Sequence, residues 1–212
     1  MNSEVNKKNI AYFDNFYKNY GGVDIISDNW LDHFKEFVDK ADMPIVDLGC
    51  GLGNNTQYLL AKGKKVLPCD ASEEAVKRVT EKFDVSGRCF DMLEPFPLVN
   101  NSTDLVIADL CLHYFTKEDT IKILKEIKRI LVSKGNLIAR VNSIANVEKR
   151  NDLYEEVEHH LYVTKDGRYK RFFDSKDIYE LFNVLEVSHI WRDMMYRYGD
   201  PKEVYMVRLK NR

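Results

Sequence analysis

The chain has 212 residues, and its 32 lysines and arginines against 34 aspartates and glutamates give a formal net charge of -2. Such a length is typical of one domain with a sizeable core, and aromatic residues at 12% argue against disorder. A nearly neutral chain has no general field that attracts nucleic acid or anionic membrane, so we expect neither as a partner.

The N-terminal segment 1–22 has no apolar core of the signal-peptide type, and no run in the chain is long and apolar enough to span a bilayer. The cysteines Cys50, Cys69, Cys89 and Cys111 have no metal-binding spacing. We therefore predict a cytoplasmic monomer or homodimer without a metal site, in which the cysteines are reduced, small and mostly buried.

Residues 1–43 precede the first predicted strand and hold a group of aromatic side chains: Tyr12, Phe13, Phe16, Tyr17, Tyr20, Trp30 and Phe34. We predict that this segment forms an N-terminal helical cap, of one or two helices, across the open end of a sheet. The rest of the chain, 44–212, is predicted to be the main domain, with an insertion at about 144–173.

From residue 44 on, short apolar runs alternate with helical patterns. Strands are predicted at 44–49, 64–70, 85–91, 103–110, 135–143, 186–192 and 203–209. Helices are predicted at 54–63, 73–83, 116–131 and 175–185, with Asn54 or Asn55, Ser72 and Thr116 as caps. This order predicts a Rossmann-like, doubly wound α/β fold: a seven-stranded, mostly parallel sheet in a three-layer α/β/α sandwich. The last two strands are joined only by a loop and should form an antiparallel pair at one edge.

The insertion contains a basic stretch at 155–173, with His159, His160, Arg168, Lys170 and Arg171. Two interpretations stay open. One is a solvated loop, and the other is a lid whose arginines bind an anionic group of the substrate.

The stretch IVDLGCGLGNN at 45–55 is a strand that breaks into three glycines, Gly49, Gly51 and Gly53, before a helix. Glycine allows a tight turn and a close approach of ligand to backbone, as in nucleotide-binding turns. Dinucleotide sites usually have the pattern G-x-G-x-x-G, whereas here Asn54 takes the third glycine's place. Asp47 would also repel a pyrophosphate but accept hydrogen bonds from an ammonium group. Both features favour a cationic or zwitterionic ligand.

Further acids follow the next strands. Asp70 fits the hydroxyls of a ribose, Asp91 with Met92 fits an adenine ring, and Asp109 ends the fourth strand. Each alone is typical of a strand end or a helix cap. Four acids at the carboxyl ends of four successive strands instead indicate one binding site.

These stretches resemble the successive motifs of the class I S-adenosylmethionine-dependent methyltransferases: VDLGCGLGNNT, VLPCDASEEAV, CFDMLEPFPLVNNSTDLVIADLCLHYF and LKEIKRILVSKGNLIARV. The resemblance covers about residues 44–143, and the C-terminal part is loosely similar to small-molecule members of the tellurite-resistance type. It departs from the usual Pro-Gly-Gly before the fifth strand, which is SKGN here. The signature Asn/Asp-Pro-Pro-Tyr of amino-directed enzymes on nucleic acid and protein glutamine is absent, because the stretch is ADLCLH.

The resemblance implies S-adenosyl-L-methionine as cofactor and a methyl transfer to a small-molecule acceptor. It implies that Asp47 holds the cofactor's amino group, Asp70 its ribose, and Asp91 with Met92 its adenine. The other cofactor-binding residues expected are Gly49, Cys50, Gly51, Asn54, Ala71, Asp109, Leu110 and Tyr20. His113 and Tyr17 are the candidate catalytic residues. A second hypothesis stays open, namely a sensor or partner subunit that binds S-adenosylmethionine or S-adenosylhomocysteine without turnover.

Overall fold

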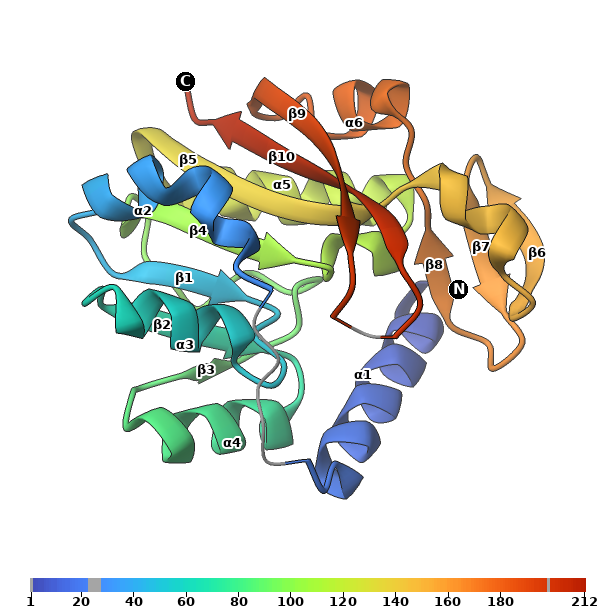
Figure 1. Ribbon diagram of the computed structural model, residues 1–212, viewed down its shortest axis with the longest axis horizontal. Helices are drawn as coiled ribbons and strands as arrows, with labels where there is room; N and C mark the ends of the chain where they lie inside the picture. Colours follow the sequence, from blue (N-terminus) through green and yellow to red (C-terminus); the bar gives the residue numbers. More distant parts are fainter. Residues whose placement is uncertain (1, 23–27, 198) are drawn as a thin grey trace.

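The computed structural model describes residues 2–22, 28–197 and 199–212. Its centre is a seven-stranded sheet with the order β3-β2-β1-β4-β5-β10-β9 (Figure 1). The strands are β1 Ile45–Leu48, β2 Val66–Asp70, β3 Arg88–Cys89, β4 Thr103–Asp109, β5 Leu131–Asn142, β9 Glu186–Met195 and β10 Lys202–Lys210. Pairing is parallel from β3 to β5, while β10 is antiparallel to both β5 and β9. The predicted fold class and C-terminal antiparallel pair are confirmed, with the reversed strand β10 one place in from the edge.

Helices cover both faces of the sheet because successive apolar side chains of its strands point to opposite faces. On one face Ile45, Leu105 and Ile107 pack against Leu59 of α3 (Asn54–Ala61). On the other face Val106 packs in a core with α5 (Lys117–Ile130) and α6 (Ser175–Leu181). Helix α4 (Glu73–Phe83) lies against β2 and β3. The three-layer arrangement places all the βα turns of the parallel strands at one end of the sheet.

Two of the predicted helix caps are confirmed, and one is wrong. Ser72 accepts a hydrogen bond from the Ala75 amide, and Thr116 accepts one from the Asp119 amide. Helix α3, however, has Gly53 as its N-cap, without a side-chain hydrogen bond. Asn55 does not cap because its amide group is bonded elsewhere, to the indole of Trp30 and to Asp47.

Several predicted bounds differ from the structure at the ends of elements. The predicted third strand, 85–91, is only Arg88–Cys89, and both of its residues are exposed, so Cys89 is the one exposed cysteine. Strand β5 begins at Leu131, directly after α5, rather than at residue 135. Helix α6 ends at Leu181 rather than residue 185. Edge pairing and tertiary packing set these ends, which the local apolar pattern does not encode.

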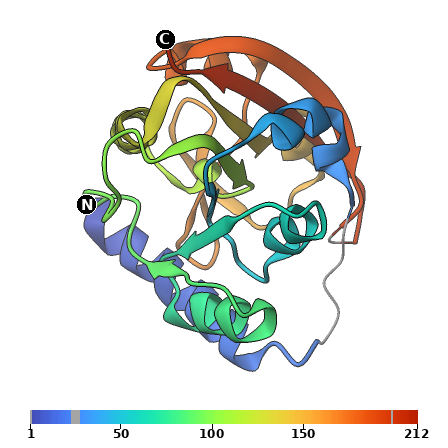
Figure 2. The same ribbon diagram turned by 90° about the vertical axis from the view of Figure 1, so that its left-hand side faces the viewer.

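The N-terminal segment divides between two places. Helix α1 (Asn2–Asn19) lies at the carboxyl ends of the strands, beside α4 (Figures 1 and 2). The short helices η1 (Trp30–Phe34) and α2 (Lys35–Lys40) instead cover a face of the sheet, where Trp30 and Phe34 join the core. The predicted placement of the aromatic residues over the open end is therefore wrong for Trp30 and Phe34, which bury more apolar area on the sheet. Residues 23–27 of the predicted cap lie outside the described residues.

The insertion folds into its own small antiparallel sheet, with the order β6-β7-β8. Its elements are η3 Ile144–Lys149, β6 Leu153–Glu158, β7 Leu161–Thr164 and β8 Tyr169–Arg171. This sheet is ordered structure rather than a solvated loop, and it stands beside the first turns of α1 (Figure 1). Among the described residues, no helix has the length and apolar character that a membrane crossing requires.

Candidate active site

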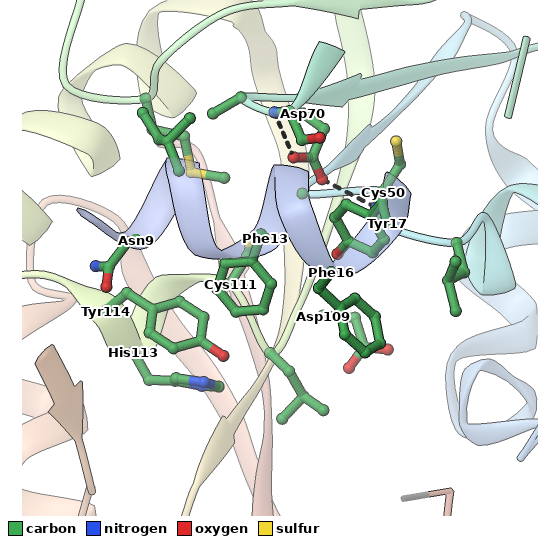
Figure 3. Close-up of a pocket in the computed structure, with 18 of the residues that line it drawn as sticks. Asn9, Phe13, Phe16, Tyr17, Cys50, Asp70, Asp109, Cys111, His113 and Tyr114 are labelled. Atoms are coloured by element: carbon green, nitrogen blue, oxygen red, sulfur yellow. Dashed lines mark hydrogen bonds between the residues drawn. The ribbon is translucent and has the colours of Figure 1, made fainter. Parts of the chain in front are cut away.

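A cavity of about 380 Å³ opens at the carboxyl ends of the parallel strands, beneath α1 (Figure 3). A volume of this size is typical of small-molecule sites. Its lining includes both candidate catalytic residues, His113 and Tyr17, and every predicted cofactor-binding residue except Asp47. The structure therefore brings these predicted residues together in one cavity, and it shows how each side chain is held.

The glycine turn after β1 requires glycine at three positions, where φ is 71°, 52° and 84° for Gly49, Gly51 and Gly53. A Cβ on Gly49 would lie 2.5 Å from Cβ of Cys111, and one on Gly51 would lie 2.9 Å from the hydroxyl of Tyr17. The left-handed backbone and these two close neighbours together exclude side chains. The turn thus brings bare backbone to the wall of the cavity.

Asp47 lies behind this turn and is fully buried. Its oxygens accept hydrogen bonds from the Thr56 hydroxyl at 2.6 Å and from the Asn55 amide at 3.4 Å. Burial raises the pKa of the Asp47 carboxyl to about 6, against the lowering effect of the two donors. In this arrangement Asp47 fastens the first turn of α3 under the glycines, and the lining of the cavity does not include it.

Asp70 lies at the end of β2 and faces the cavity. Its Oδ2 accepts from the Gly51 amide at 2.9 Å and its Oδ1 from the Ser72 amide at 3.0 Å (Figure 3). Burial raises the pKa of this carboxyl, while the backbone donors lower it. A carboxylate has about four acceptor sites, so the backbone donors, which include the Ala71 amide, leave acceptor capacity for a ligand hydroxyl.

Asp91 and Met92 follow β3 and form another part of the wall. Asp91 accepts hydrogen bonds from the Asn6 amide of α1 at 2.6 Å and from the Leu93 backbone at 2.9 Å. Met92 is buried within the core that reaches the cavity. An acceptor beside an apolar surface is the chemistry that suits the edge and face of a purine ring.

Asp109 is held by two buried arginines. Arg140 of β5 binds both of its oxygens, at 2.7 and 2.9 Å, and Arg197 binds Oδ2 at 2.7 Å. Both guanidiniums also bind Asp28, each at 2.6 Å. Although burial raises the pKa of Asp109, the two arginines outweigh it and lower the pKa overall. This four-residue ion network, which sequence reasoning missed, joins β4, β5, the turn after β9 and residue 28.

Helix α1 roofs the cavity with Phe13, Phe16 and Tyr17, and Tyr20 directly after the helix also lines it. Contacts of two side chains in the middle of the helix hold it in place. Asp14 accepts hydrogen bonds from the Ser72 hydroxyl and the Glu74 amide, and the Arg168 guanidinium lies 3.6 Å from the ring centre of Tyr12. Phe13 packs edge-on to Tyr114. Aromatic faces of this kind favour a cationic ligand beneath them.

Comparison with known proteins places this site in a family. A methyltransferase domain model matches residues 46–139. An uncharacterised protein of Methanocaldococcus jannaschii is 31% identical over 73% of this chain and 66% of its own length. An uncharacterised methyltransferase of Schizosaccharomyces pombe is 32% identical over 60% of this chain and 51% of its own length. The chain thus spans half to two thirds of these two relatives.

The match assigns residues 46–139 to the methyltransferase domain family. A more distant relative along nearly the whole chain is a transfer-RNA N(3)-methylcytidine methyltransferase of Schizosaccharomyces pombe, 24% identical over 93% of this chain and 87% of its own length. The same fold occurs in the 1,6-didemethyltoxoflavin N1-methyltransferase of Burkholderia thailandensis, solved with 1,6-didemethyltoxoflavin and S-adenosylhomocysteine. That likeness has a TM-score of 0.70 at 16% identity, over 100% of this chain and 90% of the other.

The residues of this cavity fit S-adenosylmethionine. The glycine turn offers backbone without side chains, Asp70 keeps free acceptor sites for a diol, and Asp91 beside Met92 suits an adenine. The aromatic roof suits a sulfonium. Tyr17, a candidate catalytic residue, lies near Asp70 and Cys50 and apart from His113 (Figure 3).

The other end of the cavity is polar. Figure 3 shows Asn9, Tyr114 and His113 grouped there, away from Asp70 and Cys50. His113 is buried, and its pKa lies well below the usual value because of burial and the charge of Lys170. It is therefore neutral at pH 7. Asn142, Lys170 and Lys202 line the same cavity.

The insertion's basic residues separate in the structure. Arg171 is buried and binds Glu158 and the carbonyls of Phe115 and His159, while Arg168 binds Asp166. Of the predicted patch only Lys170 lines the cavity. The anion-binding role is therefore wrong for Arg168 and Arg171, which instead hold the small sheet and α1 in place.

His159 and His160 lie outside the cavity, on the insertion beside α6. Together with Asp177 they bring three potential metal ligands within 4.8 Å of one another. Asp177, however, already accepts from the Asp174 amide in the capping box of α6 and forms a 2.6 Å contact with Nδ1 of His160. These contacts are sufficient to explain the cluster as a link between the insertion and α6.

Sequence reasoning missed the polar residues that come from distant elements: Asn6 and Asn9 of α1, Asn142, Arg197 and Lys202. Two signals in the sequence point to some of them. Asn142 ends a predicted strand of the parallel set, as Asp70 and Asp109 do. Strand β9 runs in the same direction as β5, so the turn between β9 and β10 opens at the same end of the sheet.

Proposed function

We propose that this protein transfers a methyl group from S-adenosylmethionine to a small-molecule acceptor by in-line displacement. The observation that supports the proposal best is the shared cavity. The glycine turn after β1, Asp70 after β2 and the polar group around His113 all face one space that α1 covers. Donor and acceptor can thus meet inside a roofed site of small-molecule size.

S-adenosylmethionine supplies an electrophilic methyl group on a sulfonium. The chain's own part in such a reaction is mainly positioning, which can contribute roughly 7–11 kcal/mol at best. Asp70 is fixed by two backbone amides, so its oxygens are oriented before the cofactor binds. The ion network of Asp109, Arg140, Arg197 and Asp28 holds the turn after β9 against β4 and β5. Helix α1 excludes water from above.

His113 is the candidate for proton removal when the acceptor arrives protonated. Its ring is neutral, 2% exposed, and its Nδ1 has no hydrogen-bond partner among the described residues. A neutral imidazole that lines the cavity can accept a proton from an acceptor hydroxyl or amine. We expect His113→Gln to lower kcat more than it raises KM, with the kcat loss greatest at low pH, where the acceptor is most protonated. If His113→Gln and wild type have equal kcat at all pH values, His113 is not the base.

Two other functions compete with this proposal. One is a sensor that binds the cofactor without turnover, which cofactor motifs alone never separate from an enzyme. The other is methylation of transfer RNA, as in the relative from Schizosaccharomyces pombe. A net charge of -2 favours the small acceptor, because phosphate backbones are bound largely by positive surface.

The test has two stages. Calorimetric titration with S-adenosylmethionine, S-adenosylhomocysteine and NAD comes first, and we expect binding of the first two only. Tight NAD binding without a response to the others would refute the proposal. Transfer of a labelled methyl group is then measured against a metabolite library and against transfer RNA. Label on a metabolite supports the proposal, label on RNA alone redirects it to nucleic acid, and cofactor binding without any transfer supports the sensor.

A further inference from the structure

The polar end of the cavity gathers side chains from five separate elements: Asn9 from α1, His113 from η2 (Leu112–Tyr114), Asn142 from β5, Lys170 from β8 and Lys202 from β10. No single motif encodes this group. The elements meet there because β5, the β9–β10 turn, the insertion and α1 all reach the same end of the sheet.

Three members of this group are buried without the hydrogen bonds that buried groups normally have. Asn9, His113 and Asn142 are only 5%, 2% and 5% exposed. Both amide atoms of Asn9, Nδ1 of His113 and Nδ2 of Asn142 have no partner among the described residues. An unpaired buried donor or acceptor costs about 1–3 kcal/mol, so three such side chains around one cavity indicate a ligand that completes them.

The two lysines give this end a positive charge. Among the described residues neither ammonium has a carboxylate within 4 Å, whereas neighbouring Arg150 is paired with Asp152. Burial, followed by the charge of Arg150, lowers the pKa of Lys170 to about 8 and lowers that of Lys202 as well. Both effects oppose a charged lysine, and an anion between the two would relieve them.

The acids of the cavity do not supply that anion. Asp70 and Asp91 lie on the cofactor side, where backbone and Asn6 donors hold them. Asp109 is bound by Arg140 and Arg197. Outside the cavity lining, Asp152 and Asp200 raise the pKa of these lysines, but among the described residues neither lies within 4 Å of their ammonium groups.

We propose that the methyl acceptor carries an oxyanion, a carboxylate or a phosphate, that binds between Lys170 and Lys202 and accepts a hydrogen bond from Nδ2 of Asn142. This inference rests on the proposed function, because it names the acceptor's chemical class at the same site. Two ammonium groups and an amide donor form the donor set that such an oxyanion requires. His113 lies beside this subsite, and Asn9 closes it from the roof.

The experiment uses the full chain saturated with S-adenosylhomocysteine. Benzoate, phenyl phosphate and the neutral isostere benzamide are titrated into it by calorimetry and thermal melting. We expect an anion to bind and raise the melting temperature while benzamide does neither. The double variant Lys170→Met with Lys202→Met should bind the anion at least about tenfold more weakly, as expected for lost charged hydrogen bonds. Tighter binding of benzoate indicates a carboxylate, and tighter binding of phenyl phosphate indicates a phosphate.

Lys125→Met is the matched control, because it removes one positive charge from the exposed face of α5, away from the cavity. It should leave anion binding unchanged. Lysine-labelled NMR on the wild-type chain gives a readout free of mutation, since the pKa of Lys170 should rise when the anion binds. Benzamide binding as tightly as benzoate, no anion binding, or equal binding by the double variant would overturn the inference. Titration with S-adenosylmethionine alone tests the proposed function separately, and label transfer only to neutral acceptors would leave that function standing without this subsite.

Discussion

The two ends of the cavity are built in opposite ways. On the cofactor side each acid has its donors: Thr56 for Asp47, backbone amides for Asp70, and arginines for Asp109. On the acceptor side Asn9, His113 and Asn142 have unpaired polar atoms, and the ammonium groups of two lysines have no carboxylate nearby among the described residues. The polar groups at the first end have partners within the chain, whereas several at the second end have none among the described residues.

This difference separates two demands on a transferase. A cradle for a fixed cofactor gains from being rigid before binding, so internal hydrogen bonds hold it. A subsite for the acceptor must keep its polar groups available, which lowers the stability of the free protein. Substitutions on the two sides should therefore have different effects, and four predictions test this contrast from the largest expected effect to the smallest.

Arg140→Met should have the largest effect. It leaves the buried Asp109 and the partly buried Asp28 with Arg197 as their remaining arginine. Breaking a buried ion pair in this way typically costs about 3–5 kcal/mol. We expect the free energy of unfolding, measured by urea denaturation, to fall by that amount. Arg212→Met, at the exposed C-terminus, is the control. A loss below about 1 kcal/mol would show that the network does not fasten the cavity wall.

Asp47 should make stability depend on pH. Its pKa of about 6 in the folded chain lies above the ordinary 3.8, so its stabilising contribution is complete below pH 3.8 and is lost as pH rises through about 6. About two pKa units at about 1.4 kcal/mol each give roughly 3 kcal/mol. The stability of wild type relative to Asp47→Asn should fall by this amount between pH 4 and pH 7. A difference that stays constant with pH would show that Asp47 is not held in a dry site.

Asp70→Ala should weaken cofactor binding more than it weakens the fold. The variant loses the predicted ribose acceptor and frees the amides of Gly51 and Ser72 that orient the turn. The loss of hydrogen bonds to a charged group predicts about 100-fold weaker binding of S-adenosylmethionine by calorimetry. Glu81→Ala, exposed on the same stretch of chain, should bind as wild type does. Unchanged affinity in Asp70→Ala would move the ribose site elsewhere.

The smallest effect on stability is expected at Asn142. Asn142→Leu removes an unpaired buried amide, so the free energy of unfolding should stay the same or rise by up to about 1 kcal/mol. On the cofactor side Thr56→Val deletes a paired hydroxyl and should cost about 1–3 kcal/mol. Urea denaturation of both variants compares the two ends directly. If both variants lose the same free energy of unfolding, the two ends of the cavity do not differ in how their polar groups are paired.

The sequence by itself determined most of the fold and the end of the sheet at which the predicted cofactor residues gather. The alternation of strands and helices predicted the sheet, because periods of two and 3.6 residues reflect which faces are buried. The spacing of Gly49, Gly51 and Gly53 and the acids Asp70, Asp91 and Asp109 located the cavity, because the carboxyl ends of parallel strands share one end of a sheet.

Only the tertiary structure decided how those residues are paired and what stands opposite them. Trp30 and Phe34 pack against a face of the sheet. Asp47 accepts a hydrogen bond from Thr56 and does not line the cavity. Arg140 and Arg197 bind the carboxylate of Asp109. The acceptor side draws Asn9, Asn142 and Lys202 from parts of the chain that are far apart in sequence. Local patterns encode periodicity and turns, whereas contacts between distant elements depend on how the completed layers pack. The glycine turn is therefore evident from one motif, whereas the polar end of the cavity forms only in the folded chain.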